Sequence, residues 1–156
     1  MTSNDLEVVT FDDSDLDQVI EIEEASFPDP IPRSLFASFK LTAGKGFIVA
    51  HRNGRVVGYL ILEARKDGGH ILSLAVAPGE RRMGVGEALL VESIHRYSGT
   101  RRRLSRWQKR RMYCEIRVSN RASISLFRKL LFKETGEVKK GAYPDGEDGT
   151  VMERFV

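Results

Sequence analysis

The sequence contains little cysteine and no long apolar run. Cys114 is the single cysteine among 156 residues, so no disulfide can form within the chain, and we expect a cytoplasmic protein. The longest nearly continuous apolar run spans residues 56–62, far short of the roughly 20 residues that a transmembrane helix needs. The opening residues, MTSNDL, include neither a basic start nor an apolar stretch, so we expect no secretory signal.

Basic residues are missing from the first part of the chain. Residues 1–32 contain ten acidic side chains and no lysine or arginine, although the whole chain has 25 basic and 22 acidic residues. The remainder therefore carries 25 basic against 12 acidic groups. Such a positive body favours polyanionic partners, for example a nucleic acid or a phosphorylated cofactor.

Hydrophobic periodicity predicts strands that alternate with helices. We expect strands at residues 6–11, 47–51, 55–64, 70–77, 112–118, 132–138 and 150–156, and helices at 16–25, 33–41, 86–97 and 119–131. Asn53-Gly54 predicts a hairpin turn, and the three prolines of residues 27–32 predict a rigid loop between the first two helices. The pattern favours an α/β (α+β) fold, a mixed sheet of about seven strands with about four helices on its two faces.

A glycine pair at residues 81–86, RRMGVG, stands between a predicted strand and a predicted helix. Glycines there let the backbone approach an anion, and the helix N-terminus favours phosphate. The same glycines could simply form a turn. The dinucleotide fingerprint fails because Leu89 stands where a third small residue is needed. His51, His70 and His95 lack metal-ligand spacing, so we expect no metal site.

Three segments together resemble a known family. The strand HILSLAVA followed by PGE and RRMGVG is similar to the acetyl-coenzyme A motif of the GNAT acetyltransferases, [Q/R]-x-x-G-x-[G/A], with Arg81, Gly84 and Gly86 at its positions. EIRVSNRASISLF resembles the family segment E-V-R-x-S-N-x-x-A-x-x-L-Y, and AYPDGEDGTVM resembles the Y-x-D-G-E-D segment of N-terminal acetyltransferases. The similarity covers nearly the whole chain, most firmly residues 70–152. It points to ribosomal-protein alanine acetyltransferases and to type A N-terminal acetyltransferases with their archaeal relatives, and implies a single GNAT-like domain over residues 1–156.

The resemblance implies a binding site for acetyl-coenzyme A (acetyl-CoA). In the family, the strand matching Leu74, Ala75 and Val76 splays from its neighbour, binds the pantetheine arm and directs an N–H at the thioester oxygen. The pyrophosphate is expected beside the motif, at Arg81, Arg82, Met83, Gly84, Val85, Gly86 and Glu87. Asn120 matches a cofactor-contacting asparagine, and it could equally cap the helix that follows, since one residue can do both.

Glu115 matches the position of the general base in the alanine acetyltransferases. From its strand alone it would be a polar residue alternating with buried neighbours. An α-amine with a pKa of about 7.7 to 8.0 is already roughly one tenth neutral at pH 7, whereas a lysine amine costs about 3.4 kcal/mol more to deprotonate. A carboxylate acting through water is therefore sufficient for an N-terminal substrate.

The sequence departs from the family at two positions. Phe127 replaces the tyrosine credited with protonating the leaving thiolate, so we expect Phe127 to be a core or cofactor-packing aromatic. Tyr143 matches a tyrosine of the peptide site and is a second catalytic candidate, or a loop anchor. A coenzyme A thiol with a pKa of about 8 to 9 can also leave as thiolate without a dedicated acid. Leu131 replaces a usual glycine, which suggests only altered packing at that helix end.

Two further segments are candidates for binding a partner. Phe27, Pro28 and Asp29 resemble the family's peptide-binding loop, where Asp29 could face a cationic α-amine or be a solvated turn residue. Residues 101–111, RRRLSRWQKRR, form either a solvated connection or an RNA-facing patch that docks the enzyme at ribosomes.

The leading hypothesis is transfer of an acetyl group from acetyl-CoA to the α-amine of protein N-termini, with ribosomal proteins or nascent chains among the possible substrates. Two alternatives stay open. One is a lysine or small-amine acetyltransferase of the same fold, and the other is a basic RNA-binding module. The intact RRMGVG segment argues against the second, because nucleic-acid binding does not need a phosphate cradle of this kind.

Overall fold

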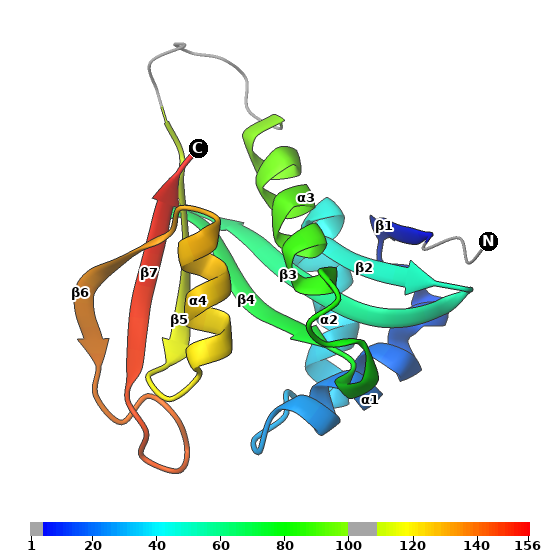
Figure 1. The fold of residues 1–156 in the computed structure, drawn as a ribbon, viewed down its shortest axis with the longest axis horizontal. Helices are drawn as coiled ribbons and strands as arrows, with labels where there is room; N and C mark the ends of the chain where they lie inside the picture. Colours follow the sequence, from blue (N-terminus) through cyan, green and yellow to red (C-terminus); the bar gives the residue numbers. More distant parts are fainter. Residues whose placement is uncertain (1–4, 100–108) are drawn as a thin grey trace.

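One sheet organises the molecule (Figure 1). The computed structural model describes residues 5–99 and 109–156. Within them the strands are β1 (Leu6–Thr10), β2 (Phe47–Arg52), β3 (Arg55–Arg65), β4 (Gly68–Val76), β5 (Arg111–Arg117), β6 (Lys133–Lys139) and β7 (Gly149–Phe155). The helices are α1 (Leu16–Ser26), α2 (Arg33–Ala43), α3 (Val85–Gly99) and α4 (Arg121–Lys129). The predicted mixed sheet of seven strands with four helices is confirmed, and most boundaries agree with the expected ones to within about two residues.

The sheet order is β1-β2-β3-β4-β5-β7-β6. β1 to β4 form an antiparallel meander, with a turn at Asn53-Gly54 between β2 and β3, where both residues have positive φ. β4 and β5 pair in parallel, and β7 pairs antiparallel with both β5 and β6. A parallel neighbour needs a crossover, which α3 provides on one face of the sheet.

Helices cover both faces of the sheet because the strands alternate their apolar side chains. In β2, Ile48 and Ala50 face one core cluster, while Phe47 and Val49 face the other. The first cluster receives apolar residues of α3 and α4, including Leu89. The second receives those of α1 and α2. The central strands β2 and β3 are thus apolar on both sides.

The parallel pairing of β4 and β5 is short. It joins only Gly69–Ile71 to Met112–Cys114. β4 then continues beside β3 as far as Val76, which pairs with Gly58. Figure 1 shows β4 and β5 diverging toward the edge at which the α1–α2 loop and the β6–β7 loop lie. Backbone groups on the β5 side of Leu74 to Val76 are consequently left without a strand partner, as the resemblance implied.

The end of α4 corrects one expectation. Leu131 has a φ of 67°, the left-handed conformation that favours glycine. Phe132 N donates to Phe127 O at 2.9 Å and Leu131 N donates to Arg128 O at 2.9 Å, which is the hydrogen-bond pattern of a Schellman C-cap. The leucine is 68% exposed. The expectation of altered packing alone is wrong, because the main consequence of losing glycine here is backbone strain.

The basic stretch of residues 101–111 is only partly described. Residues 101–108 lie outside the described residues. Arg111 belongs to β5, where its Nε donates to Glu153 Oε2 at 2.6 Å, and the guanidinium of Arg110 lies 4.7 Å from the centre of the Tyr97 ring. These two arginines therefore contribute to the fold itself. None of the described helices is long and apolar enough to cross a membrane.

Candidate active site

Two cavities meet where β4 and β5 stop pairing. The larger, of about 640 Å³, is lined by residues 74–76, by most of residues 80–87 and by α4. The smaller, of about 210 Å³, extends between the α1–α2 loop, β5 and Tyr143. Four residues line both cavities: Phe27, Leu74, Asn120 and Ser123. A molecule in one cavity can therefore contact a molecule in the other at this junction.

The glycine loop forms the floor of the larger cavity. Gly84 has a φ of 82°, which turns the chain sharply before α3. A Cβ added at Gly86 would lie 3.1 Å from Leu126 Cδ2, so the absent side chain leaves the first turn of α3 open toward the cavity. The N–H groups of that turn and the positive end of the helix dipole suit a phosphate. Together with the free edge of β4, this cradle fits the pyrophosphate and pantetheine arm of acetyl-CoA.

The charged residues around the cradle differ in what they contact. Arg81 donates from Nε to Val76 O at 3.1 Å and from Nη2 to Ser26 Oγ at 3.2 Å, which ties the loop to β4 and α1. Arg82 lines the cavity and is exposed. Lys129 and Glu87 form an ion pair at 2.7 Å across the cavity wall. Arg82 is thus better placed than Arg81 to meet a phosphate.

Two predicted cofactor residues do not line the larger cavity. Met83 is 54% exposed and lines neither cavity. Phe127 is buried, packs edge-on against Phe132 with ring centres 5.0 Å apart, and lines only the smaller cavity. Asn120 caps α4, accepting from Ser123 N at 3.2 Å, and it also lines both cavities. The helix-cap reading of Asn120 is confirmed, and its cofactor contact stays a prediction.

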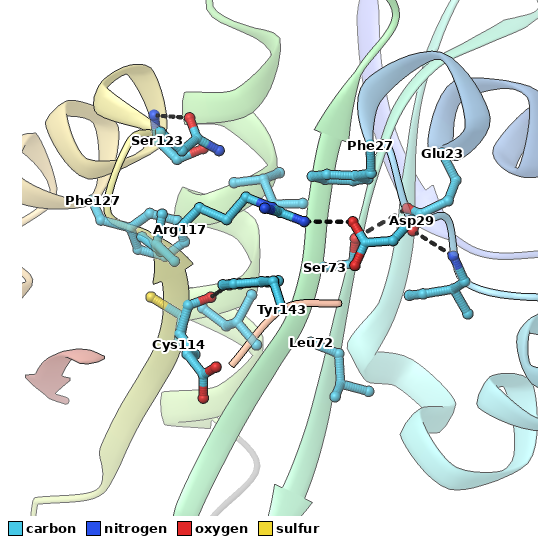
Figure 2. A pocket seen from close by; sticks show the side chains of 16 residues that line it. Glu23, Phe27, Asp29, Leu72, Ser73, Cys114, Arg117, Ser123, Phe127 and Tyr143 are labelled. Atoms are coloured by element: carbon cyan, nitrogen blue, oxygen red, sulfur yellow. Dashed lines mark hydrogen bonds and ion pairs between the residues drawn. The ribbon is translucent and has the colours of Figure 1, made fainter. Parts of the chain in front are cut away.

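Glu115 and Tyr143 both line the smaller cavity, and Tyr143 is labelled in Figure 2. The Tyr143 hydroxyl lies 3.4 Å from Glu115 O, a long hydrogen bond. Burial and then the charge of Glu115 raise the pKa of Tyr143 to about 12, so the phenol keeps its proton at neutral pH. Gly149 of β7 leaves room for the carboxylate, since a Cβ there would lie 2.9 Å from Glu115 Cγ. The glutamate is exposed and can reach a bound amine through water.

Arg117 joins three carboxylates from two loops, an arrangement that we call the clasp. It binds Asp29 at 2.6 Å, Asp145 at 2.8 Å and Glu147 at 3.0 Å, and its guanidinium lies 4.2 Å from the centre of the Tyr143 ring. The pKa of Arg117 is raised by its hydrogen bond to Glu147 first, and those of the two β6–β7 loop carboxyls are lowered. Figure 2 shows the arginine spanning the cavity to Asp29.

Phe27 and Asp29 line the smaller cavity as expected, whereas Pro28 lines neither. Asp29 is not a freely solvated turn residue, since one carboxylate oxygen is taken by Arg117. Arg117 lies within the EIRVSNRASISLF segment, but the sequence alone does not predict its role. The three acidic residues within residues 145–148 could have indicated a cationic partner.

Glu23 is a second residue that sequence reasoning missed. It is 2% exposed and lines the smaller cavity. Its carboxylate accepts from Ile31 N at 3.0 Å and from the hydroxyls of Tyr59 and Ser73. Burial raises the pKa of Glu23 above its usual range, against these hydrogen bonds. Its position beside the apolar residues Ile20 and Ile22 on α1 was the available signal.

The histidines serve local roles. His51 Nε2 lies 2.9 Å from Asp15 Oδ1, and His70 stacks on Tyr113 with ring centres 4.7 Å apart. Burial lowers the pKa of His70 to about 4. Across residues 5–99 and 109–156, no group of three or more His, Cys, Asp or Glu residues is arranged to hold a metal ion.

Known proteins are similar to this chain in both sequence and fold. The chain matches the acetyltransferase (GNAT) family over residues 16–132. It is 33% identical over 151 residues to an N-alpha-acetyltransferase of Sulfolobus acidocaldarius, covering 89% of this chain and 86% of that protein. Among solved structures, the ribosomal-protein-S18-alanine N-acetyltransferase of Escherichia coli superposes with a TM-score of 0.81 at 26% identity, covering 97% of this chain and 94% of the other. Ard1 of Thermoplasma volcanium gives a TM-score of 0.86 at 24% identity, covering 97% of both chains. The chain therefore belongs to the acetyltransferase (GNAT) family, and within it to the acetyl-CoA-dependent N-α-acetyltransferases.

Proposed function

We propose that this chain, with residues 1–156 as one catalytic domain, acetylates the N-terminal α-amine of proteins at the junction of its two cavities. The larger cavity receives acetyl-CoA and the smaller receives the substrate N-terminus. The observation that carries the proposal is the junction itself. The phosphate cradle lies on one side of the β4–β5 split and Glu115 lies on the other, so that thioester and amine meet between them.

On the acetyl-CoA side, binding depends mostly on backbone groups. The free edge of Leu74 to Val76 pairs with the pantetheine arm, and one of its N–H groups polarises the thioester oxygen. Gly84, Gly86 and the first turn of α3 hold the pyrophosphate, with Arg82 as the neighbouring cation. Arg81 acts indirectly, because it fixes Val76 and thereby the edge of β4.

On the amine side, Glu115 removes the proton through a water molecule. An α-amine needs little help at neutral pH, since its pKa of about 8 lies more than two pH units below that of lysine. An exposed carboxylate is therefore adequate for an N-terminal substrate and poorly suited to lysine. The neutral amine then attacks the thioester carbon directly, and the C–S bond breaks.

The substrate N-terminus lies between the α1–α2 loop and Tyr143. Phe27 packs against its first side chain, and Asp29 and the protonated Tyr143 hydroxyl face its polar groups. The clasp of Arg117 keeps these two loops at a constant separation. Tyr143 is a hydrogen-bond donor on the peptide side, where its pKa of about 12 keeps it protonated.

One incubation tests this function. Short peptides varied at their first two residues are mixed with the protein and acetyl-CoA, and products are mapped by mass spectrometry. Matched peptides with a blocked N-terminus and one internal lysine serve as the control. We expect acetyl groups on α-amines and almost none on the blocked set. Preferential modification of the blocked peptides would establish a lysine acetyltransferase instead.

Binding of the cosubstrate is tested separately from turnover. A ligand at 100 times its Kd stabilises the folded state by about 2.7 kcal/mol. Acetyl-CoA should therefore raise the melting temperature in a concentration-dependent manner, and no shift would contradict the assignment of the larger cavity.

A further inference from the structure

The hydroxyl that the family places on α4 has moved by one helical turn in this chain. In the segment E-V-R-x-S-N-x-x-A-x-x-L-Y, the fixed alanine stands four residues before the fixed tyrosine. Here those positions are Ser123 and Phe127. Residues four apart on a helix lie on the same face, one above the other. The chain has therefore lost a hydroxyl at residue 127 and gained one at residue 123 of the same helix face.

Ser123 lies at the junction of the two cavities. It lines both of them, whereas Phe127 lines only the smaller. The helix is capped through the backbone of Ser123, whose N–H donates to Asn120 Oδ1 at 3.2 Å. This contact fixes the first turn of α4 and leaves the side chain of the serine for other partners. Figure 2 shows Ser123 and Phe127 on neighbouring turns of α4.

The other side-chain hydroxyls that line the two cavities already form hydrogen bonds within the protein. Ser26 donates to Ile22 O at 2.6 Å, Ser73 contacts Glu23, and Tyr143 contacts Glu115 O. Within residues 5–99 and 109–156, Ser123 hydrogen-bonds through its backbone N–H, and its hydroxyl has no partner in the protein. The thiol of Cys114, which also lines the smaller cavity, has its pKa raised to about 12 by burial and is a weak donor.

We propose that Ser123 is a catalytic residue that donates a hydrogen bond to the sulfur of coenzyme A as it leaves. This rests on the proposed function, because the sulfur must pass the junction where amine and thioester meet. The N–C bond forms and the C–S bond breaks, the amine proton goes through water to Glu115, and the sulfur departs as thiolate. Ser123 keeps its own proton throughout, and the thiolate later takes a proton from solvent.

The chemistry matches the residue. A serine hydroxyl is too weak an acid to protonate a thiolate, but a hydrogen bond to a developing negative charge is about twice as strong as one between neutral groups. The N-terminal end of α4 adds a favourable dipole at the same place. The Ser123 hydrogen bond and the helix dipole together stabilise the thiolate. This stabilisation can take the place of the proton that the family tyrosine is credited with supplying.

Ser123→Ala is the decisive variant. Alanine is the residue of the family motif and a better helix former than serine, so the fold should be retained. We expect kcat for a short peptide to fall about tenfold, the loss typical of removing one hydrogen bond to a charged group, with both KM values within about twofold. Ser125→Ala, on the exposed side of the same helix, is the matched control and should be unchanged. Ser123→Thr retains the hydroxyl and should keep most of the rate.

A spectroscopic titration separates catalysis from structure. Thiolate absorbance of coenzyme A bound to the enzyme gives the pKa of its thiol, which the Ser123 hydrogen bond should lower. Ser123→Ala should raise that pKa by about one unit, equivalent to a tenfold change in the ionisation constant. Wild-type kcat in Ser123→Ala, or a slower variant whose bound thiol titrates as in the wild type, would overturn the role. Neither result affects the proposed function, which fails only if the wild-type protein leaves α-amines unmodified.

Discussion

The two sides of the active site are built in different ways. The side proposed to bind acetyl-CoA comes mainly from one continuous stretch, residues 74–87, in which strand, turn and helix follow one another. The peptide side combines α1, β5 and the β6–β7 loop, and its Arg117–Asp29 pair joins residues 88 positions apart. The first is mainly a backbone site, whereas the second is a side-chain site. Backbone sites depend on local conformation, and side-chain sites depend on how distant elements pack.

The difference also separates what each side does. Backbone N–H groups are present in every chain, so the cradle can remain the same while the substrate changes. In the proposed function, the peptide side contains Glu115, Tyr143 and the clasp, and it would therefore determine which amine reacts. Substitutions on the two sides should affect different kinetic constants, which the following variants test.

Glu115→Gln should give the largest loss. General bases typically contribute about 100-fold or more, and the amine is mostly protonated at pH 6.5. We expect kcat/KM for peptide α-amines to fall about 100-fold at pH 6.5 and far less at pH 9, where the amine deprotonates unaided. Glu137→Gln, on exposed β6, is the control. A loss of equal size at both pH values would indicate a structural or binding role.

Gly86→Asp should weaken acetyl-CoA binding at least tenfold while leaving the protein folded. The new carboxylate would occupy and repel the pyrophosphate site. Gly86→Ala measures how much of the lost affinity is steric, because the added Cβ would lie 3.1 Å from Leu126 Cδ2 and carries no charge. This variant should bind acetyl-CoA more tightly than Gly86→Asp. Calorimetric titration gives both affinities. Wild-type affinity in Gly86→Asp would contradict the cradle.

Arg117→Gln should raise the KM for peptide about fivefold and leave the KM for acetyl-CoA unchanged, because only the clasp is lost. Arg128→Gln, which removes an exposed ion pair of α4 to Glu134, is the control. If both KM values rise together, the clasp supports the whole domain and not the peptide loops.

The clasp also predicts a pH dependence. The pKa of Asp145 is lowered in the folded protein first by the backbone N–H of Glu147 and then by Arg117, and the pKa of Glu147 is lowered first by Ser119 and then by Arg117. Their contribution to stability is therefore present above the ordinary carboxyl range near pH 4 and is lost as the pH falls through the folded values. Thermal melts of wild type and Arg117→Gln should converge at low pH.

Leu131→Gly should stabilise the protein by about 1 kcal/mol, because glycine adopts the left-handed conformation of residue 131 without strain. α4 lines both cavities, so this variant tests whether helix stability alone alters either side. We expect a rise of about 2 to 4 °C in melting temperature with unchanged kinetics. Leu131→Ala keeps the Cβ and should show no such gain.

The smallest catalytic effect is expected from Arg101, Arg102 and Arg103. Replacing all three with glutamine should keep peptide turnover within about twofold, since in the sequence they lie outside both the RRMGVG motif and the segment that begins at Glu115. If these residues dock the enzyme on RNA, ribosome co-sedimentation should fall, and the log-log salt slope should decrease by about 0.7 to 0.9 for each phosphate contact removed. If ribosome binding and its salt slope are both unchanged, the three arginines only form part of a solvated surface. Arg110 and Arg111 stay in place, because they contact Tyr97 and Glu153.

Local sequence was sufficient for much of the fold and for identifying the glycine loop that lines the larger cavity. Alternating apolar residues predicted the strands, Asn53-Gly54 predicted the hairpin, and Gly84 and Gly86 predicted the cradle. Each depends on backbone preferences within a few residues. Arg82 could be assigned to the cradle as well, whereas the exposure of Met83 and the structural contacts of Arg81 could not be foreseen.

The peptide side was decided by the tertiary structure. The sequence identified Glu115, Tyr143 and Asp29 as candidates, but not that Arg117 bridges two loops or that Glu23 is buried beneath them. The strain at Leu131 likewise appears only once the helix ends in a left-handed residue. Ion pairs, burial and cavity junctions arise from side chains that are distant in sequence, and only the packing of β5, α1 and α4 around the split between β4 and β5 brings them together.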